Sequence, residues 1–157
     1  MHRHWQFIRA DLINKNNILK FENIPKIDVN VPIPGLTVET ILNGENFHNW
    51  LVGFIEAELA FTLGNNRAGW SLTQSNAPIF MEAIKKYLGV TTSIYPDLRD
   101  NTNLIIREES VTGVQRMIDF LNTPNCAILL GYKKLQYNNW CNELSKMPRY
   151  KNVKFTV

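Results

Sequence analysis

Between residues 46 and 144 the chain alternates helices with pairs of short β runs, and this order restricts the folds open to it. The predicted helices span, in chain order, residues 46–58, 77–88, 111–121 and 128–144. The predicted strands span residues 60–63 and 69–73, then 92–95 and 103–107. Each pair of strands is joined by a short polar segment and reads as a hairpin. The sequence therefore predicts the α+β class with an antiparallel sheet.

The length of 157 residues suits one ordinary domain and is short for two. Three prolines between residues 21 and 45 favour an extended segment ahead of the first helix. We therefore divide the chain into an N-terminal arm, a domain and a basic C-terminal tail, at residues 1–45, 46–145 and 146–157.

The formal net charge of +3 is unevenly distributed. Residues 131–157 carry six basic side chains and one acid, whereas residues 87–119 carry five acids and three basic side chains. The six basic residues are Lys133, Lys134, Lys146, Arg149, Lys151 and Lys154. They are our candidates for binding nucleic-acid phosphates, and an ordinary solvated surface is the alternative interpretation.

Composition narrows the cellular setting. Asparagine accounts for 19 of the 157 residues and isoleucine for 15, and because both have AT-rich codons this hints at an organellar gene. The two cysteines, Cys126 and Cys141, lack the spacing of a zinc site. No apolar run approaches the roughly 18 residues that a membrane span requires, so we expect no membrane partner.

The first predicted helix has two unusual features near its end. Gly53 and Ala57 lie four residues apart, so one strip of the helix has almost no side chain and lets another backbone approach closely. Glu58 falls in the last turn, where the helix dipole disfavours a carboxylate. Either a bound metal ion or exposure to solvent would account for it.

Residues 51–59, LVGFIEAEL, resemble the signature of the LAGLIDADG homing endonucleases. The resemblance continues in SLTQ at residues 71–74, which is similar to the end of the family's second strand. LGYKKLQY at residues 130–137 and MPRY at residues 147–150 look like the C-terminal stretch of organellar members. The resemblance as a whole covers about residues 46–152 and implies the family's αββαββα unit.

The resemblance also implies roles for particular residues. Two signature helices would pack against each other through Gly53 and Ala57. Glu58 would bind a divalent metal such as Mg²⁺ at the base of a saddle-shaped sheet in the DNA major groove, and Gln74 would lie near the scissile phosphates. Since this sequence has one signature, cleavage would require a homodimer on a near-palindromic target or a second protein.

Departures from the family pattern suggest that cleavage has been lost. Leu59 stands where the signature ends in glycine, which permits a tight turn beside the metal. The first hairpin is short, and Ser110 stands where active members often have a lysine. The second hairpin is acidic, a poor complement to a polyanion. Its acids are Asp97, Asp100, Glu108 and Glu109.

The leading hypothesis is a nucleic-acid-binding structural protein derived from a LAGLIDADG homing endonuclease, without enzymatic activity or cofactor. Its partners would be rRNA and neighbouring proteins of a mitochondrial or other organellar ribonucleoprotein, such as the mitochondrial ribosome. The alternative is an active homodimeric DNA endonuclease using Mg²⁺, Glu58 and Gln74, or an intron maturase. A third hypothesis is a protein adaptor that holds a partner helix on the Gly53 and Ala57 face.

Overall fold

A computed structural model of the chain describes residues 35–155, which belong to one compact unit. Most of the predicted arm therefore lies outside the described residues. Its end is helical rather than extended, because α1 (Val38–Leu42) is capped by Thr37, whose side chain accepts a hydrogen bond from the Thr40 N–H at 3.1 Å. A capping threonine followed by a helical turn thus outweighs the extended pattern set by the prolines before it.

Four antiparallel strands form the sheet, in the order β1-β2-β4-β3. The strands are β1 (Leu59–Gly64), β2 (Arg67–Ser75), β3 (Tyr95–Asp97) and β4 (Asp100–Glu108). The predicted class and the antiparallel sheet are confirmed. The second hairpin is displaced from its predicted position, with strands over residues 95–97 and 100–108 rather than 92–95 and 103–107.

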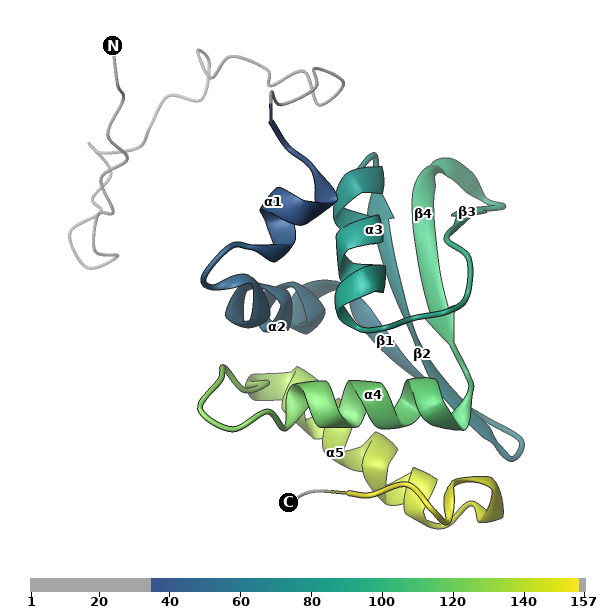
Figure 1. Ribbon diagram of the computed structural model, residues 1–157. Coiled ribbons are helices and arrows are strands. Elements are labelled where there is room, and N and C mark those ends of the chain that lie inside the picture. Colours follow the sequence, from purple (N-terminus) through teal and green to yellow (C-terminus); the bar gives the residue numbers. More distant parts are fainter. Residues whose placement is uncertain (1–34, 156–157) are drawn as a thin grey trace, which may run out of the picture. The chain divides into compact units, whose positions relative to one another are not determined.

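The α-helices after α1 are α2 (Phe47–Glu58), α3 (Pro78–Tyr87), α4 (Val111–Leu121) and α5 (Gly131–Ser145). In Figure 1, α3 and α4 lie on the same side of the sheet. None of the helices in residues 35–155 is both long and apolar enough to cross a bilayer.

The last helix begins three residues later than predicted, because the preceding segment is pinned along α2 in an extended form. The Ala127 N–H donates to Asn49 Oδ1 at 2.8 Å, and the Leu130 N–H donates to Glu56 Oε2 at 2.9 Å. These two tertiary hydrogen bonds satisfy backbone groups that a helix would otherwise use.

Successive residues of β2 point to opposite faces of the sheet, and only one face is packed. Ala68, Trp70 and Leu72 are buried in the hydrophobic core. Ser71 and Thr73, which point the other way, remain partly exposed. We call the face that carries Ser71 and Thr73 the open face.

The described part of the predicted basic tail packs against the domain. After α5 the chain forms a 3₁₀ turn, η3 (Pro148–Tyr150), in which Tyr150 is fully buried. The Tyr150 hydroxyl donates to the Ala68 carbonyl and accepts from the Ala68 N–H, both at 2.8 Å. Further along, the Gln115 side chain pairs with both backbone groups of Lys154 at 2.7 and 3.1 Å. The segment as far as Lys154 is thus anchored to its own fold.

Candidate nucleic-acid interface

The strip of small residues predicted on the signature helix is uncovered in the described part of the chain. Gly53 and Ala57 are exposed on α2, and no heavy atom lies within 4 Å of the position that a Cβ on Gly53 would take. Trp50, on the same helix, is 43% exposed and stacks between Phe47 and Phe54, with ring centroids 5.5 and 5.2 Å apart. Within residues 35–155 the strip is exposed, and its use as a helix-packing surface stays a prediction.

Glu58 ends α2, and its side chain is exposed. Leu59 follows with φ −80° and ψ 136°, an extended conformation that any residue adopts, and its side chain is 2% exposed in the core. The junction between helix and strand therefore has no need of glycine, and Leu59 does not obstruct the surface beside Glu58.

A lysine lies beside this junction. Lys133 on α5 donates from Nζ to the Leu59 carbonyl at 2.6 Å, which places an ammonium group one residue from Glu58 in the chain. Lys133 was predicted to bind phosphate, but its nitrogen donates to a backbone carbonyl here.

Gln74, the second predicted catalytic residue, lies on β2 two residues beyond Leu72, which pairs with Leu59. The Gln74 side chain is partly buried on the packed face.

These residues alone do not fit a divalent metal ion. No three His, Cys, Asp or Glu side chains within residues 35–155 are grouped so that they could hold one. Glu56, the carboxylate nearest to Glu58 in the chain, is occupied by the Leu130 N–H. The Lys133 ammonium, bound to the Leu59 carbonyl, adds positive charge beside the residue that follows Glu58 and so disfavours a cation nearby. A metal site at Glu58 would be incomplete without a carboxylate from a second unit.

The second hairpin has less exposed, unpaired negative charge than its sequence suggests, and so repels a polyanion less. Asp97 is 8% exposed and pairs with Arg99, with Nη2 and Oδ2 2.9 Å apart. The hydrogen bonds from the Arg99 side chain and backbone hold the pKa of the Asp97 carboxyl below its usual value. Glu108 is 2% exposed and accepts from the Ser110 hydroxyl at 2.8 Å, while Glu109 pairs with Arg107 at 2.7 Å. Three of the four acids are therefore buried or paired.

Ser110 has a structural role. Its hydroxyl caps α4 by accepting from the Gly113 N–H at 2.9 Å and also donates to buried Glu108. A Cβ on Gly113 would overlap the Glu108 carboxylate, so this corner is closely packed. Ser110 follows β4 four residues beyond Ile106, which shares a row of the sheet with Leu59, and so lies away from Glu58.

Hydroxyl, amide and small apolar side chains dominate the open face. They are Ala60, Thr62, Ser71, Thr73, Ser75, Tyr95, Asn103 and Ile105. The charges on this side gather where β2 begins and β4 ends, at Arg67, Arg107 and Glu109. Hydrogen-bonding side chains flanked by arginine suit base edges beside a phosphate backbone.

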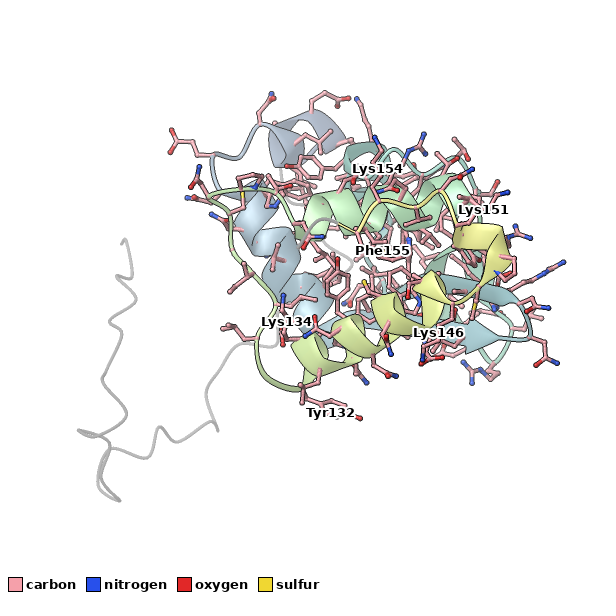
Figure 2. The ribbon with its side chains drawn as sticks, turned by 90° about the horizontal axis from the view of Figure 1, so that it is seen from below. Tyr132, Lys134, Lys146, Lys151, Lys154 and Phe155 are labelled. Carbon is pink, nitrogen blue, oxygen red and sulfur yellow. The ribbon has the colours of Figure 1, made fainter. Side chains whose placement is uncertain are left out.

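The structure divides the predicted basic cluster. Figure 2 shows Lys134 and Lys146 at opposite ends of α5, with Lys151 and Lys154 on the C-terminal segment. Lys146 is paired with Glu143 at 2.6 Å. Of the six predicted basic residues, only Arg149 lines a cavity of about 700 Å³, together with Arg67 and Arg107.

Arg67 and Arg107 are absent from the set predicted from the sequence. Strand alternation gives a signal for Arg107, because it falls between the buried Ile106 and Glu108 and must point to the open face. Arg149 joins them through a tertiary contact for which the sequence pattern holds no signal.

Comparison with known proteins bears on the fold and on descent. No protein-family profile matches the sequence. The probable intron-encoded endonuclease Cox1-I1b of Schizosaccharomyces pombe is 26% identical over 163 residues, which cover 96% of this chain and 41% of the relative. The chain thus spans about two fifths of the length of this relative.

Solved structures share the arrangement of helices and strands. The homing endonuclease I-TnaI superimposes with a TM-score of 0.55 at 17% identity, over 68% of this chain and 77% of that protein. The LAGLIDADG homing endonuclease I-LtrWI, bound to target DNA, gives 0.54 at 18% identity over 70% and 39%. The archaeal intron-encoded homing endonuclease I-Vdi141I, complexed with DNA, gives 0.51 at 23% over 62% and 65%. The resemblance carried by residues 51–59 and the predicted fold class are both confirmed.

Proposed function

We propose that this chain, which has the fold of the LAGLIDADG homing endonucleases, binds nucleic acid along the open face of its sheet and has lost cleavage. The open face itself carries the proposal. Ser71, Thr73 and Ser75 project from alternate positions of one strand, where hydroxyl groups reach base edges. Solved structures of the same fold are described as bound to DNA, which supports a nucleic-acid partner.

The loss of cleavage rests on the surroundings of Glu58. A single exposed carboxylate with a lysine ammonium beside the next residue is a poor cation site. Phosphodiester hydrolysis with two metal-bearing halves needs developing charge to be neutralised on both sides of the scissile bond. The described residues supply at most half of such a site.

The alternative function is cleavage of DNA with Mg²⁺ by two paired units, each contributing Glu58. One observation favours it: the Gly53 and Ala57 strip on α2 is uncovered. Leu59, packed in the core, would not block this arrangement.

For the cellular setting we propose a mitochondrial or other organellar ribonucleoprotein, with rRNA and neighbouring proteins as partners. The abundance of asparagine and isoleucine supports an organellar gene, and the matched relative is named as an intron-encoded endonuclease, Cox1-I1b. Lys134, Lys151 and Lys154 are not among the residues that line the cavity with Arg149, and they could bind a second stretch of phosphate backbone. Purification of the native protein should yield RNA and many proteins, whereas recovery free of both would contradict this setting.

Binding is tested with the whole chain, by fluorescence anisotropy on labelled duplex DNA and on structured RNA. Thr73→Glu places a carboxylate in the middle of the open face and should weaken binding by about tenfold or more, since like charges repel. Asn43→Glu adds the same charge at the C-cap of α1, outside the open face and the basic residues, where residue 43 is exposed, and should leave the affinity within about twofold. Equal effects of the two changes would move binding away from the open face.

Cleavage is tested on a randomised duplex library in Mg²⁺. We expect no strand breaks above those in a sample with chelator. Mg²⁺-dependent breaks that disappear in Glu58→Gln would overturn the loss of cleavage and establish the alternative.

A further inference from the structure

Three arginines from separate parts of the chain converge on one cavity. The cavity measures about 700 Å³ and opens at the end of the sheet where β2 begins and β4 ends. Arg67 is the first residue of β2, Arg107 is next to last in β4, and Arg149 comes from η3. Guanidinium groups repel one another unless an anion lies between them.

The fold holds two of these arginines side by side through their neighbours in the chain. Tyr150 is fully buried, and its hydroxyl makes two 2.8 Å hydrogen bonds to the backbone of Ala68. Arg149 and Arg67 directly precede these two anchored residues. Buried, directional contacts therefore fix the backbone positions from which both arginines reach the cavity.

The carboxylates in the cavity leave it positively charged. Glu109 pairs with Arg107, at 2.7 Å between Oε1 and Nη2, and its side chain is 36% exposed. Glu108 also borders the cavity, but its side chain is 2% exposed and accepts a hydrogen bond from Ser110. Among residues 35–155, neither Arg67 nor Arg149 has a carboxylate within ion-pair distance.

Hydroxyl groups complete the lining. Ser93 and Tyr95, from the segment that leads into β3, border the cavity beside the arginines. Tyr95 and Arg107 also lie on the open face, since Tyr95 pairs with Ile105 and Arg107 pairs with Ser71. The cavity is thus continuous with the surface to which we assign nucleic acid.

We propose that this cavity binds a phosphate group of the nucleic-acid backbone, with Arg67 and Arg149 as permanent donors and Glu109 as a competitor for Arg107. The assignment to a backbone phosphate rests on the proposed function. Guanidinium groups bind phosphate oxygens in bidentate fashion, and hydroxyl donors supply further hydrogen bonds. Phosphate would displace Glu109, which can swing into solvent because it is part exposed.

The competition gives two substitutions with opposite expected effects. Arg149→Gln removes a donor, and should weaken oligonucleotide binding about tenfold and lower the slope of log Kobs against log salt by about one. Glu109→Gln frees Arg107 and should strengthen binding. Lys86→Gln on α3, where the lysine is 60% exposed and pairs with Glu39, removes one charge outside the cavity and serves as the matched control.

Titrations with an oligonucleotide and with pyrophosphate distinguish a phosphate of the nucleic-acid backbone from free phosphate as the ligand of the cavity. If the wild type binds the oligonucleotide and the two cavity variants shift in opposite directions relative to Lys86→Gln, the proposal holds. If both cavity variants bind the oligonucleotide as Lys86→Gln does, the cavity proposal fails while the proposed function stands. If no oligonucleotide binds but pyrophosphate raises the melting temperature of the wild type and not of Arg149→Gln, the cavity binds free phosphate and the proposed function fails. If neither ligand binds, both fail.

Discussion

Tyr150 completes the pairing of β2 at a position where the neighbouring strand has ended. β4 pairs with β2 only as far as Glu108 opposite Trp70, so the Ala68 N–H and carbonyl have no strand beside them on that edge. The Tyr150 hydroxyl takes both, in a site with no exposure to water. One phenolic oxygen thereby replaces a residue of backbone and fixes η3.

Tyr150→Phe should lower the free energy of unfolding by about 2–6 kcal/mol, because it leaves a buried N–H and a buried carbonyl without partners at about 1–3 kcal/mol each. Urea denaturation measures the change. Tyr132→Phe, at a side chain that is 74% exposed, removes the same hydroxyl and should leave stability unchanged. Equal losses from the two substitutions would contradict the role assigned to Tyr150.

His48 makes stability depend on pH. Its ring packs on Phe120 with centroids 4.3 Å apart, its Nδ1 lies 3.1 Å from the Tyr87 hydroxyl, and its buried Nε2 has no partner among the described residues. Desolvation disfavours the imidazolium form and lowers the pKa of His48 below 6.5 in the folded state.

Because the unfolded chain keeps a histidine pKa near 6.5, it binds more protons than the folded chain at acid pH. The contribution of His48 is therefore complete above about pH 6.5 and is lost as the pH falls toward the lower folded pKa. The free energy of unfolding of the wild type should drop more between about pH 7.5 and pH 5.5 than that of His48→Gln. Both proteins keep His2 and His4, so the difference isolates His48, and parallel profiles would refute the assignment.

At the scale of elements, local signals predicted most of the helices and the first hairpin. The third predicted helix, 111–121, matches α4, because Ser110 is a strong N-cap and the apolar spacing is helical. The turn between β1 and β2 contains Asn66 with φ 57°, a conformation that asparagine tolerates. Where residue type alone determines the backbone conformation, the sequence is sufficient to predict the element.

Tertiary hydrogen bonds account for the elements that were misplaced. The Thr92 hydroxyl donates to the Arg107 carbonyl at 3.0 Å, and the chain enters β3 only at Tyr95. The segment before α5 stays extended because Asn49 and Glu56 of α2 bind its N–H groups. Partners this far apart in the chain leave no local pattern to detect.

The same reasoning applies to the site. The spacing of Gly53 and Ala57 places them on one face of α2, since residues four apart share a helix face, and both are exposed there. Charge counting failed in the second hairpin, because burial removes Glu108 and pairing neutralises Asp97. It also grouped Arg149 with the lysines of α5, although only Arg149 lines the cavity.

At the scale of the whole molecule, the length of the related proteins bears on the uncovered strip of α2. The chain corresponds to 41% of the curated relative and 39% of I-LtrWI, so each has room for a second unit of similar size. A second unit, either another copy of this chain or a separate protein, would cover Gly53 and bring a second carboxylate toward Glu58. An isolated unit would leave the strip in water.

Gly53→Leu tests whether a second helix packs on the strip of α2, without disturbing the fold of the unit itself. A Cβ at residue 53 meets no atom outside the α2 backbone within 4 Å, and the position is exposed, so the free energy of unfolding should hold or rise, by up to about 1 kcal/mol from helix propensity. A helix packed on the strip would be displaced, so the dimer expected for the wild type on duplex DNA in sedimentation experiments should revert to a monomer. Asn138→Leu, an exposed change on α5, should leave the mass of the complex unaltered. A wild type that stays monomeric at every concentration, with and without DNA, would rule out pairing through α2 between copies of this chain and confine the protein to one-sided binding.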